Sequence, residues 1–201
     1  CGITFTVKDW KDDLSQEIRE LQRLIGKLAA SYLEDGDTII LDAGAATEYL
    51  APFLRDCGSI KIITNSANVF QRVHTFPNVE LFLTGGKFDP QTRSFVGRGA
   101  HLLLADVRAD KVFIVAKGVS ADFGLSAAAE VTADVQRSMM NAAREVIVLA
   151  DHTLLDAESD FFVSGLDRVN TLITDAGITP SQRLKLSHLG IKVLIAGQVF
   201  D

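Results

Sequence analysis

Cysteine, tryptophan, tyrosine and methionine are scarce in this chain of 201 residues, which has two, one, two and two of them respectively. Cys1 and Cys57 form neither a CxxC pair nor a metal-ligand spacing, so each is expected to be a buried or incidental thiol. The four histidines are scattered, and no two lie at the helical spacing of metal ligands. The sequence therefore gives no sign of a metal site, and no cofactor is expected.

Long apolar runs are also absent. No segment approaches the 18 or more apolar residues of a membrane span, and no basic-then-apolar signal peptide opens the chain. We therefore expect a cytoplasmic protein without a membrane partner. The 20 Lys and Arg residues are outnumbered by 26 Asp and Glu, a net charge of -6, which argues against this chain holding nucleic acid by itself.

What the sequence does contain is enough apolar material for a sizeable core: 47% of the residues are hydrophobic and 23% are charged. From Ser15 to Leu33, apolar residues recur at three- and four-residue spacing, which predicts an amphipathic helix. The preceding residues 1–14, with Trp10 among charged neighbours, are interpreted as an arm or linker. Residues 15–201 are predicted to form one domain.

Short apolar runs alternate with helical patterns along the rest of the chain. The predicted strands are Thr38–Leu41, Ile60–Ile63, Val79–Leu83, Lys111–Val115, Val146–Leu149, Thr171–Thr174 and Lys192–Ile195. The predicted helices between them are Glu48–Leu54, Asn68–His74, Gly99–Val107, Val131–Arg144 and Pro180–Leu189. Strands that are apolar along their length are typical of a mostly parallel sheet with helices on both faces, so the predicted fold class is α/β. Phe161–Val163 is predicted as a short strand in a protruding segment.

In an open parallel sheet, ligands bind beyond the carboxyl ends of the strands. The first predicted strand runs into Asp42-Ala43-Gly44-Ala45-Ala46-Thr47 and then a helix, where small residues let backbone N–H groups face a bound anion. An ordinary tight turn favours the same small residues, so the turn alone does not decide between the two. Asn65 and Ser66, after the second strand, are equally explained as helix caps. Later strand ends carry Gly85-Gly86-Lys87, Lys117-Gly118 and Asp151-His152.

Taken in order, these segments resemble the C-terminal domain of the DeoR family of bacterial repressors. The resemblance extends from about Ile18 to Ile195 and is closest in the lead-in Asp35–Gly44. Its motifs are Asp42-Ala43-Gly44-x-x-Thr47, Thr64-Asn65-Ser66, Gly85-Gly86, Phe95-Val96-Gly97, Asn141–Val146, Ala150-Asp151-His152 and Leu172–Asp175.

The resemblance implies an N-terminal winged helix-turn-helix that this chain lacks, and a domain related in fold to ribose-5-phosphate isomerase and the CoA transferases. Such a domain senses a sugar phosphate or similar phosphorylated effector, works as a homodimer or homotetramer, and meets DNA only through the missing module. The implied effector site consists of Asp42, Gly44, Ala45, Ala46 and Thr47 around the phosphate with Asn65 and Ser66 beside them, Gly86 and Lys87 in the pocket wall, and Lys117, Gly118, Glu130 and Asp151 toward the hydroxyls.

Five residues depart from the family pattern. Ala45-Ala46 replaces a Ser-Thr pair, Lys117 replaces an acid, and Leu154 and Gln136 stand where a lysine is frequent. One hypothesis is that Lys117 supplies the lost cation; the alternative is a solvent-facing lysine beside an altered pocket.

Two other functions stay open at this point. The related fold includes isomerases, and Glu130 with Lys117 is one conceivable acid-base arrangement, although no Ser-His-Asp or Cys-His arrangement is evident. A ligand-independent oligomerisation module is the other alternative. We expect a sensor rather than an enzyme, in which effector binding shifts the population of subunit arrangements.

Overall fold

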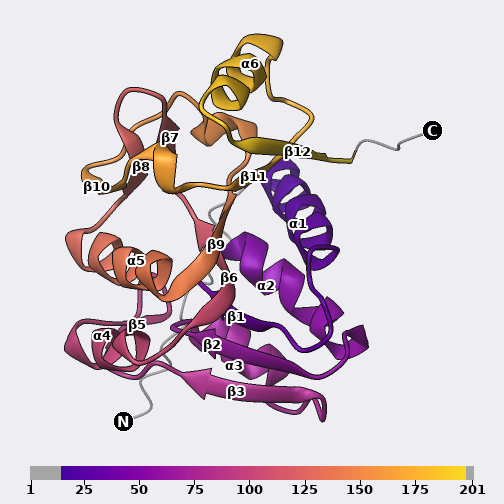
Figure 1. Ribbon diagram of the computed structural model, residues 1–201, viewed down its shortest axis with the longest axis vertical. Coiled ribbons are helices and arrows are strands. Elements are labelled where there is room, and N and C mark those ends of the chain that lie inside the picture. The colour runs from indigo at the N-terminus through magenta and orange to yellow at the C-terminus, as the bar shows by residue number, and fades with distance from the viewer. Residues whose placement is uncertain (1–14, 198–201) are drawn as a thin grey trace, which may run out of the picture.

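Seven parallel strands form the central sheet of the computed structural model, which describes residues 15–197. The strand order is β12-β11-β9-β6-β1-β2-β3 (Figure 1). The strands are β1 (Thr38–Leu41), β2 (Ile60–Thr64), β3 (Val79–Leu83), β6 (Ala109–Val115), β9 (Ala143–Leu149), β11 (Thr171–Asp175) and β12 (Lys192–Ala196). All seven predicted strands and the α/β class are confirmed. The arm, with Trp10 and Cys1, lies outside the described residues.

Helices connect these strands. They are α1 (Gln16–Ala30), α2 (Ala45–Leu50), α3 (Ala67–Val73), α4 (Arg98–Ala105), α5 (Glu130–Ala142) and α6 (Pro180–His188), with short 3-10 helices η2 (Ala51–Asp56), η3 (His152–Leu154) and η4 (Leu166–Arg168). The predicted helix Glu48–Leu54 was wrong in its start, because α2 begins at Ala45 directly after the turn. The predicted end at Arg144 was also wrong, because Ala143 already pairs with Ala109 in the sheet.

Helices cover both faces of the sheet, and the strands divide their side chains between two cores. In β9, Val146 and Val148 belong to one core while Ile147 and Leu149 belong to the other. The first core lies against α4, α5 and α6, and the second lies against α1, α2, η2 and α3. Strand neighbours point to opposite faces, so burial of both faces requires an unbroken apolar run. These unbroken apolar runs allowed the central strands to be predicted from the sequence.

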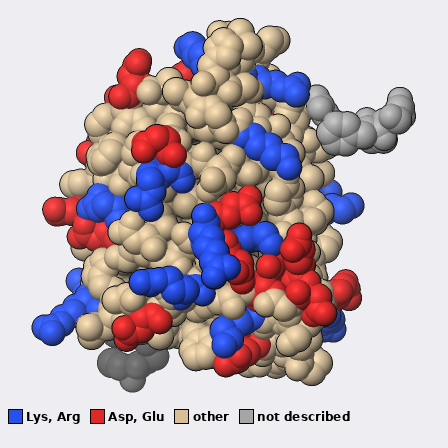
Figure 2. All heavy atoms as spheres, viewed as in Figure 1, with Lys and Arg blue, Asp and Glu red and all other residues tan. Residues whose placement is uncertain are grey.

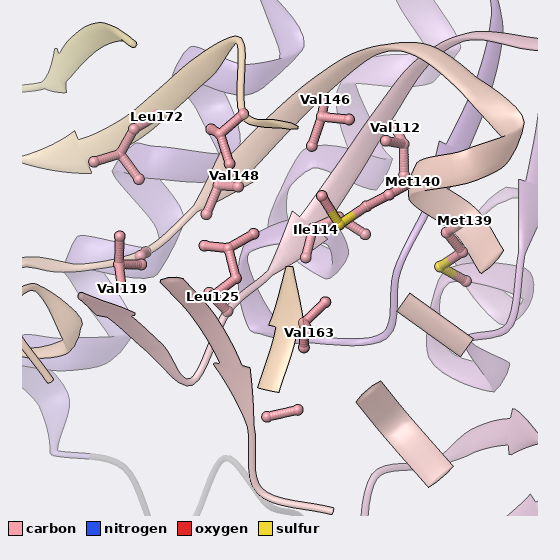
Figure 3. Packing of buried hydrophobic residues seen from close by; sticks show 14 of the residues in the cluster. Val112, Ile114, Val119, Leu125, Met139, Met140, Val146, Val148, Val163 and Leu172 are labelled. Carbon is pink, nitrogen blue, oxygen red and sulfur yellow. The ribbon is translucent and has the colours of Figure 1, made fainter. Parts of the chain in front are cut away.

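The first core also includes side chains of a small antiparallel sheet formed by residues 118–120, 124–127 and 161–164 (Figure 3). In this close-up the labelled side chains from β6, β9, β11 and α5 converge with those of the protruding strands: Val112, Ile114, Val146, Val148, Leu172, Met139, Met140, Val119, Leu125 and Val163.

Two small antiparallel sheets were mostly missed from sequence. One has the order β10-β8-β7, with β7 (Gly118–Ser120), β8 (Gly124–Ala127) and β10 (Phe161–Ser164), and only its strand β10 was predicted. The other is the hairpin of β4 (Lys87–Asp89) and β5 (Ser94–Val96). These strands have three or four residues each, too few to establish a period of two.

The two edge strands of the large sheet depart from the expectation of full burial. Residues of β3 alternate between half-buried and exposed, and β12 begins with the exposed Lys192. Each edge strand has a sheet neighbour on one side only, so less of its surface is covered. In the described part of the chain, no helix has both the length and the apolar character to span a membrane.

The order in which the parallel strands follow one another in the sheet changes direction next to β1. From β1 the chain proceeds through β2 to β3 on one side, and then returns to β6, which pairs with the other side of β1. The carboxyl ends of β1 and β6 therefore diverge into different connections at a topological switch point, the usual ligand-binding position of open α/β sheets.

Candidate functional site

The turn after β1 lies at this switch point and is held by its own side chains. The hydroxyl of Thr47 lies 2.7 Å from the carbonyl oxygen of Asp42 and 2.9 Å from that of Gly44, so it braces the turn from within. A Cβ on Gly44 would lie 2.6 Å from the nearest side-chain carbon of Val115 on β6. Glycine is therefore required here by close packing between the turn and the neighbouring strand.

The turn leaves backbone donors unused. Gly44 is the N-cap of α2 and provides no side-chain acceptor. Within residues 15–197, no group accepts a hydrogen bond from the N–H of Ala45, Ala46 or Thr47. The first N–H groups of a helix lack intrahelical partners and carry its partial positive charge. Ala45 and Ala46 are buried, and they provide no hydroxyl donors.

Asp42 lies beneath the turn and does not face solvent; only 1% of its surface is exposed. Its Oδ1 accepts from the N–H of Ala43, at 2.8 Å. Its Oδ2 accepts from the Val115 N–H at 3.2 Å and from Gln136 Nε2 at 2.7 Å. Burial raises the pKa of Asp42 to about 6, and the hydrogen bonds from Gln136 and Val115 and the charge of Lys117 oppose that rise. The carboxyl group thus links β1, β6 and α5 under the predicted phosphate loop.

The loop after β2 lies beside this turn. Thr64 donates from its hydroxyl to the Leu41 carbonyl at 2.7 Å, which ties the two strand ends together. Ser66 caps α3 by accepting from the Val69 N–H at 3.2 Å. Asn65 is 2% exposed, and its Oδ1 has no hydrogen-bond partner among the described residues. The capping interpretation therefore holds for Ser66, while Asn65 keeps an unsatisfied acceptor next to the turn.

The remaining predicted residues lie around the same edge with different exposures. Lys117, the second residue after β6, is exposed, and its charge acts on Asp42. Gly118 is buried, and a Cβ there would collide with the Ser126 hydroxyl. Glu130 is exposed at the first position of α5. These residues belong to connections that leave the switch point.

Gly86 and Lys87 belong to the β4–β5 hairpin after β3. Both are exposed. Gly86 has a φ of 111°, and a Cβ at this position would lie 2.5 Å from the Val96 carbonyl oxygen. Glycine is thus demanded by backbone conformation as well as by packing.

Asp151, after β9, is directed toward α1. Its Oδ2 accepts from Gln22 Nε2 at 2.6 Å, and its Oδ1 accepts from the N–H of Thr153 at 3.1 Å and from the Thr153 hydroxyl. The residue is 3% exposed. Both carboxylate oxygens therefore already bind protein donors, and they connect the effector edge of the sheet to the first helix.

One pair at this edge was overlooked in the sequence. His152 lies in the connection after β9, Asp175 is the last residue of the neighbouring strand β11, and His152 Nδ1 lies 2.8 Å from Asp175 Oδ1. The four histidines looked scattered along the chain, and only the parallel pairing of β9 with β11 brings this one to its aspartate. The signal available in the sequence was the position of Asp175 directly at the end of a predicted strand.

Three cavities, with volumes of about 370, 360 and 250 Å³, are lined by described residues away from the turn. The first lies at α6, the second lies between α4 and α5, and the third lies near the N-terminal ends of β1 and β2. None of the predicted effector residues lines any of the three.

Charged side chains of both signs are interspersed over the face shown in Figure 2. Lysine and arginine do not form a continuous stripe on this face. Duplex binding rests on such clustered cations. This face therefore gives no support for direct nucleic-acid binding.

The match to known families decides the identity of the domain. Residues 18–176 match the family model described as the DeoR C-terminal sensor domain. The chain belongs to the DeoR family.

Several relatives of the chain are transcriptional repressors. The HTH-type transcriptional repressor GlcR of Bacillus subtilis (strain 168) is 34% identical over 185 residues, which cover 90% of this chain and 69% of GlcR. The HTH-type transcriptional repressor CsqR of Escherichia coli (strain K12) is 27% identical over 176 residues, which cover 88% of this chain and 67% of CsqR. About a third of each repressor thus lies outside the match.

Solved structures place the DeoR sensor domain in the expected fold group. A D-ribose-5-phosphate isomerase in complex with phospho-erythronic acid aligns with a TM-score of 0.51 at 17% identity, over 71% of this chain and 56% of that one. The β subunit of eIF2B from Chaetomium thermophilum aligns with a TM-score of 0.53 at 16% identity, over 78% of this chain and 48% of that one. The predicted relation to the isomerase fold is confirmed.

Proposed function

We propose that this DeoR sensor domain binds a phosphorylated sugar or polyol at the carboxyl edge of its sheet, and that binding modulates DNA binding by a separate winged helix-turn-helix. The observation that carries the proposal is the turn at the switch point. At the start of α2 it offers three N–H groups that have no acceptor among residues 15–197. Backbone N–H groups and the positive end of a helix are a general means of holding phosphate.

Cationic support for a phosphate comes from Lys117. Its exposed side chain follows β6, the strand against which Gly44 packs, and its charge acts on the neighbouring Asp42. We assign Lys117 the role of the hydroxyl donors that Ala45 and Ala46 do not provide. Asn65, whose Oδ1 has no partner in the described part of the chain, is assigned to a ligand hydroxyl, because a hydroxyl is a donor that a phosphate dianion lacks.

The output of the sensor is assigned to α1, which contacts two of the strand-end loops. Gln22 donates to Asp151 after β9. One turn later, Gly26 lies against α2, where a Cβ would be 2.5 Å from the Ala46 carbonyl oxygen. Ligand binding that moves either loop acts on one face of α1. A change in affinity between two states is what this mechanism requires.

The other parts of the proposal follow from the family. We place the protein in the cytoplasm, as a homo-oligomer that reaches DNA only through the winged helix-turn-helix, and we assign it no enzymatic activity. The exposure of Glu130 and Lys117 favours binding over catalysis, because a proton-abstracting carboxylate benefits from a water-excluded setting. Turnover of any phosphorylated sugar would contradict this assignment.

A thermal-shift screen against sugar and polyol phosphates tests the proposal, because a ligand that binds only the folded state raises the melting temperature. We expect Lys117→Ala to weaken binding of the best compound by roughly 10-fold to 100-fold, the cost of one charge-assisted hydrogen bond. Lys61→Ala removes the same charge from the opposite end of the sheet, where Lys61 pairs with the exposed Glu80, and should leave binding unchanged.

Equal effects of the two variants would show that Lys117 contributes only long-range charge. A flat screen with a folded protein would overturn phosphate sensing and promote the alternative of a ligand-independent oligomerisation module.

A further inference from the structure

The His152–Asp175 pair is built like a functional dyad. Asp175 is 1% exposed and accepts three hydrogen bonds: from His152 Nδ1 at 2.8 Å, from the His152 N–H at 2.7 Å and from the Gly177 N–H at 2.8 Å. The imidazole side chain itself is 35% exposed. A buried carboxylate thus holds both the backbone and the ring of a histidine that reaches solvent.

The ring is also clamped from the side. A Cβ on Gly177 would overlap the His152 ring, so the ring packs directly on the Gly177 backbone. A carboxylate can only accept, so the hydrogen lies on Nδ1, and Nε2 of the neutral ring is an acceptor. Among the described residues, none forms a hydrogen bond with Nε2. The pair therefore presents one fixed acceptor at the effector edge.

The position of this acceptor relative to the turn follows from the sheet. In the strand order, β9 lies two places from β1. Adjacent strands are about 4.8 Å apart, so the connection that bears His152 starts about 10 Å from the turn. That separation suits a compound whose phosphate lies at the turn and whose carbon chain extends across β6.

The surrounding charges select a neutral partner. Asp175 and Asp151 flank His152, and within residues 15–197 the Asp151 carboxylate is hydrogen bonded only to the uncharged Gln22 and Thr153. A second anionic group would be repelled by these carboxyl groups, whereas a hydroxyl can donate to Nε2. No serine, threonine or cysteine of the described chain is hydrogen bonded to the ring, and no group of three or more metal-ligating side chains occurs there. A nucleophile–base pair and a metal site are thus both unsupported.

We propose that His152, oriented by Asp175, recognises a hydroxyl at the far end of the effector and so selects six-carbon over three-carbon phosphates. The proposal rests on the proposed function, since it places the phosphate at the turn. Asp175 and Gly177 are positioning residues, and His152 is the binding residue.

Two measurements test the proposal. The first is the 15N spectrum of the histidine side chains without ligand, in which His152 should have the hydrogen on Nδ1. The second is a titration with D-glucitol 6-phosphate, glycerol 3-phosphate and inorganic phosphate. We expect the six-carbon compound to bind about five- to tenfold more tightly than the three-carbon one, the contribution of one hydrogen bond, and to shift the Nε2 resonance.

Three variants separate binding from structure. His152→Ala should abolish the preference for the six-carbon compound. Gly177→Ala keeps the imidazole but displaces it, and should abolish the preference as well. His188→Ala, at the exposed end of α6, is the matched control and should retain it.

A ring with its hydrogen on Nε2, a wild-type protein without the six-carbon preference, or a preference that survives His152→Ala would each overturn the proposal. If shifts occur at the turn but never at His152, the hydroxyl contact fails and phosphate sensing stands. If no compound shifts either region, the proposed function fails and this inference fails with it.

Discussion

At the scale of single residues, Asp42 is the group whose chemistry departs most from its ordinary state. Full burial raises its pKa to about 6 from an ordinary value near 4. The folded chain therefore binds this proton more tightly than the unfolded chain does. The stabilisation is fully present below about pH 4 and is lost as the pH rises through about 6. With about 1.4 kcal/mol per pKa unit, the loss is about 3 kcal/mol.

Asp42→Asn, which cannot titrate here, isolates this effect. The difference in unfolding free energy between variant and wild type should move in favour of the variant by about 2.5 kcal/mol between pH 4 and pH 7. Urea unfolding at one-unit pH steps measures it, with Asp122→Asn at an exposed site as control. A difference that does not vary with pH would show that Asp42 has an ordinary pKa.

The side chain that is hydrogen bonded to the Asp42 carboxyl group is the uncharged Gln136. Its Nε2 donates to both Asp42 and the Val115 carbonyl, and its buried Oε1 has no hydrogen-bond partner among the described residues. The family resemblance implies a lysine here. Gln136→Lys should place an ammonium group against Asp42, favour the charged carboxylate and remove the loss of stability between pH 4 and pH 6. Gln136→Met, of similar length but without a donor, should extend the loss to higher pH. Parallel urea titrations of the two variants measure both effects.

At the scale of helices and strands, the sequence was informative where burial imposed a long pattern. The seven strands of the large sheet were all identified, and for the five inner strands the reason is that covering both faces demands apolar residues throughout, as in Val146–Leu149. The end of α5 was not identified, because alanines in Asn141–Ala143 suit helix and strand alike and only pairing with β6 decides between them. The loops of the candidate site were located because they follow predicted strands. The directions of their side chains could not be predicted in the same way. Asp151 was expected to face the ligand, while its carboxylate binds Gln22.

Helix α1 packs closely on α2 because residue 26 is a glycine and has no side chain. Ala is normally more favourable than Gly inside a helix, by about 1 kcal/mol. At Gly26 the sign should reverse, because the new Cβ would lie 2.5 Å from the Ala46 carbonyl oxygen and 2.8 Å from the Leu50 nitrogen. We expect Gly26→Ala to destabilise the domain by about 1–3 kcal/mol, as overpacking does.

Lys27→Ala, on the exposed side of the same helix, should have an effect within about 0.5 kcal/mol. Urea unfolding distinguishes the two changes. A neutral or stabilising Gly26→Ala would mean that α1 moves away from α2 at little cost, and the assignment of α1 as the output helix would lose its tightest contact.

At the scale of the whole molecule, the proposed effector site and the proposed output helix α1 lie at different positions in the domain. Helices α1 and α2 lie together on one side of the sheet, while α4 and α5 cover the other (Figure 1). The strand-end turn begins α2, and α1 packs on α2. A ligand at the turn is thus one helix away from α1, the first described element of the chain.

This arrangement predicts where binding is felt. With the compound that most raises the melting temperature, amide hydrogen exchange should slow at the turn and also in α1, around Gln22 and Gly26. Couplings of 1–3 kcal/mol correspond to about 5-fold to 150-fold changes in an equilibrium, so an effect of about 5-fold or more is expected in α1. Helix α6 packs on the edge strand β12 and makes neither of these contacts, so its exchange serves as the internal control.

Slowing confined to residues 42–47 and 115–118 would show that the ligand leaves α1 unchanged, and the signal would then have to leave the domain through another surface. Slowing in α1 that disappears in Gln22→Leu, with the ligand still bound, would assign the transmission to the Gln22–Asp151 hydrogen bond.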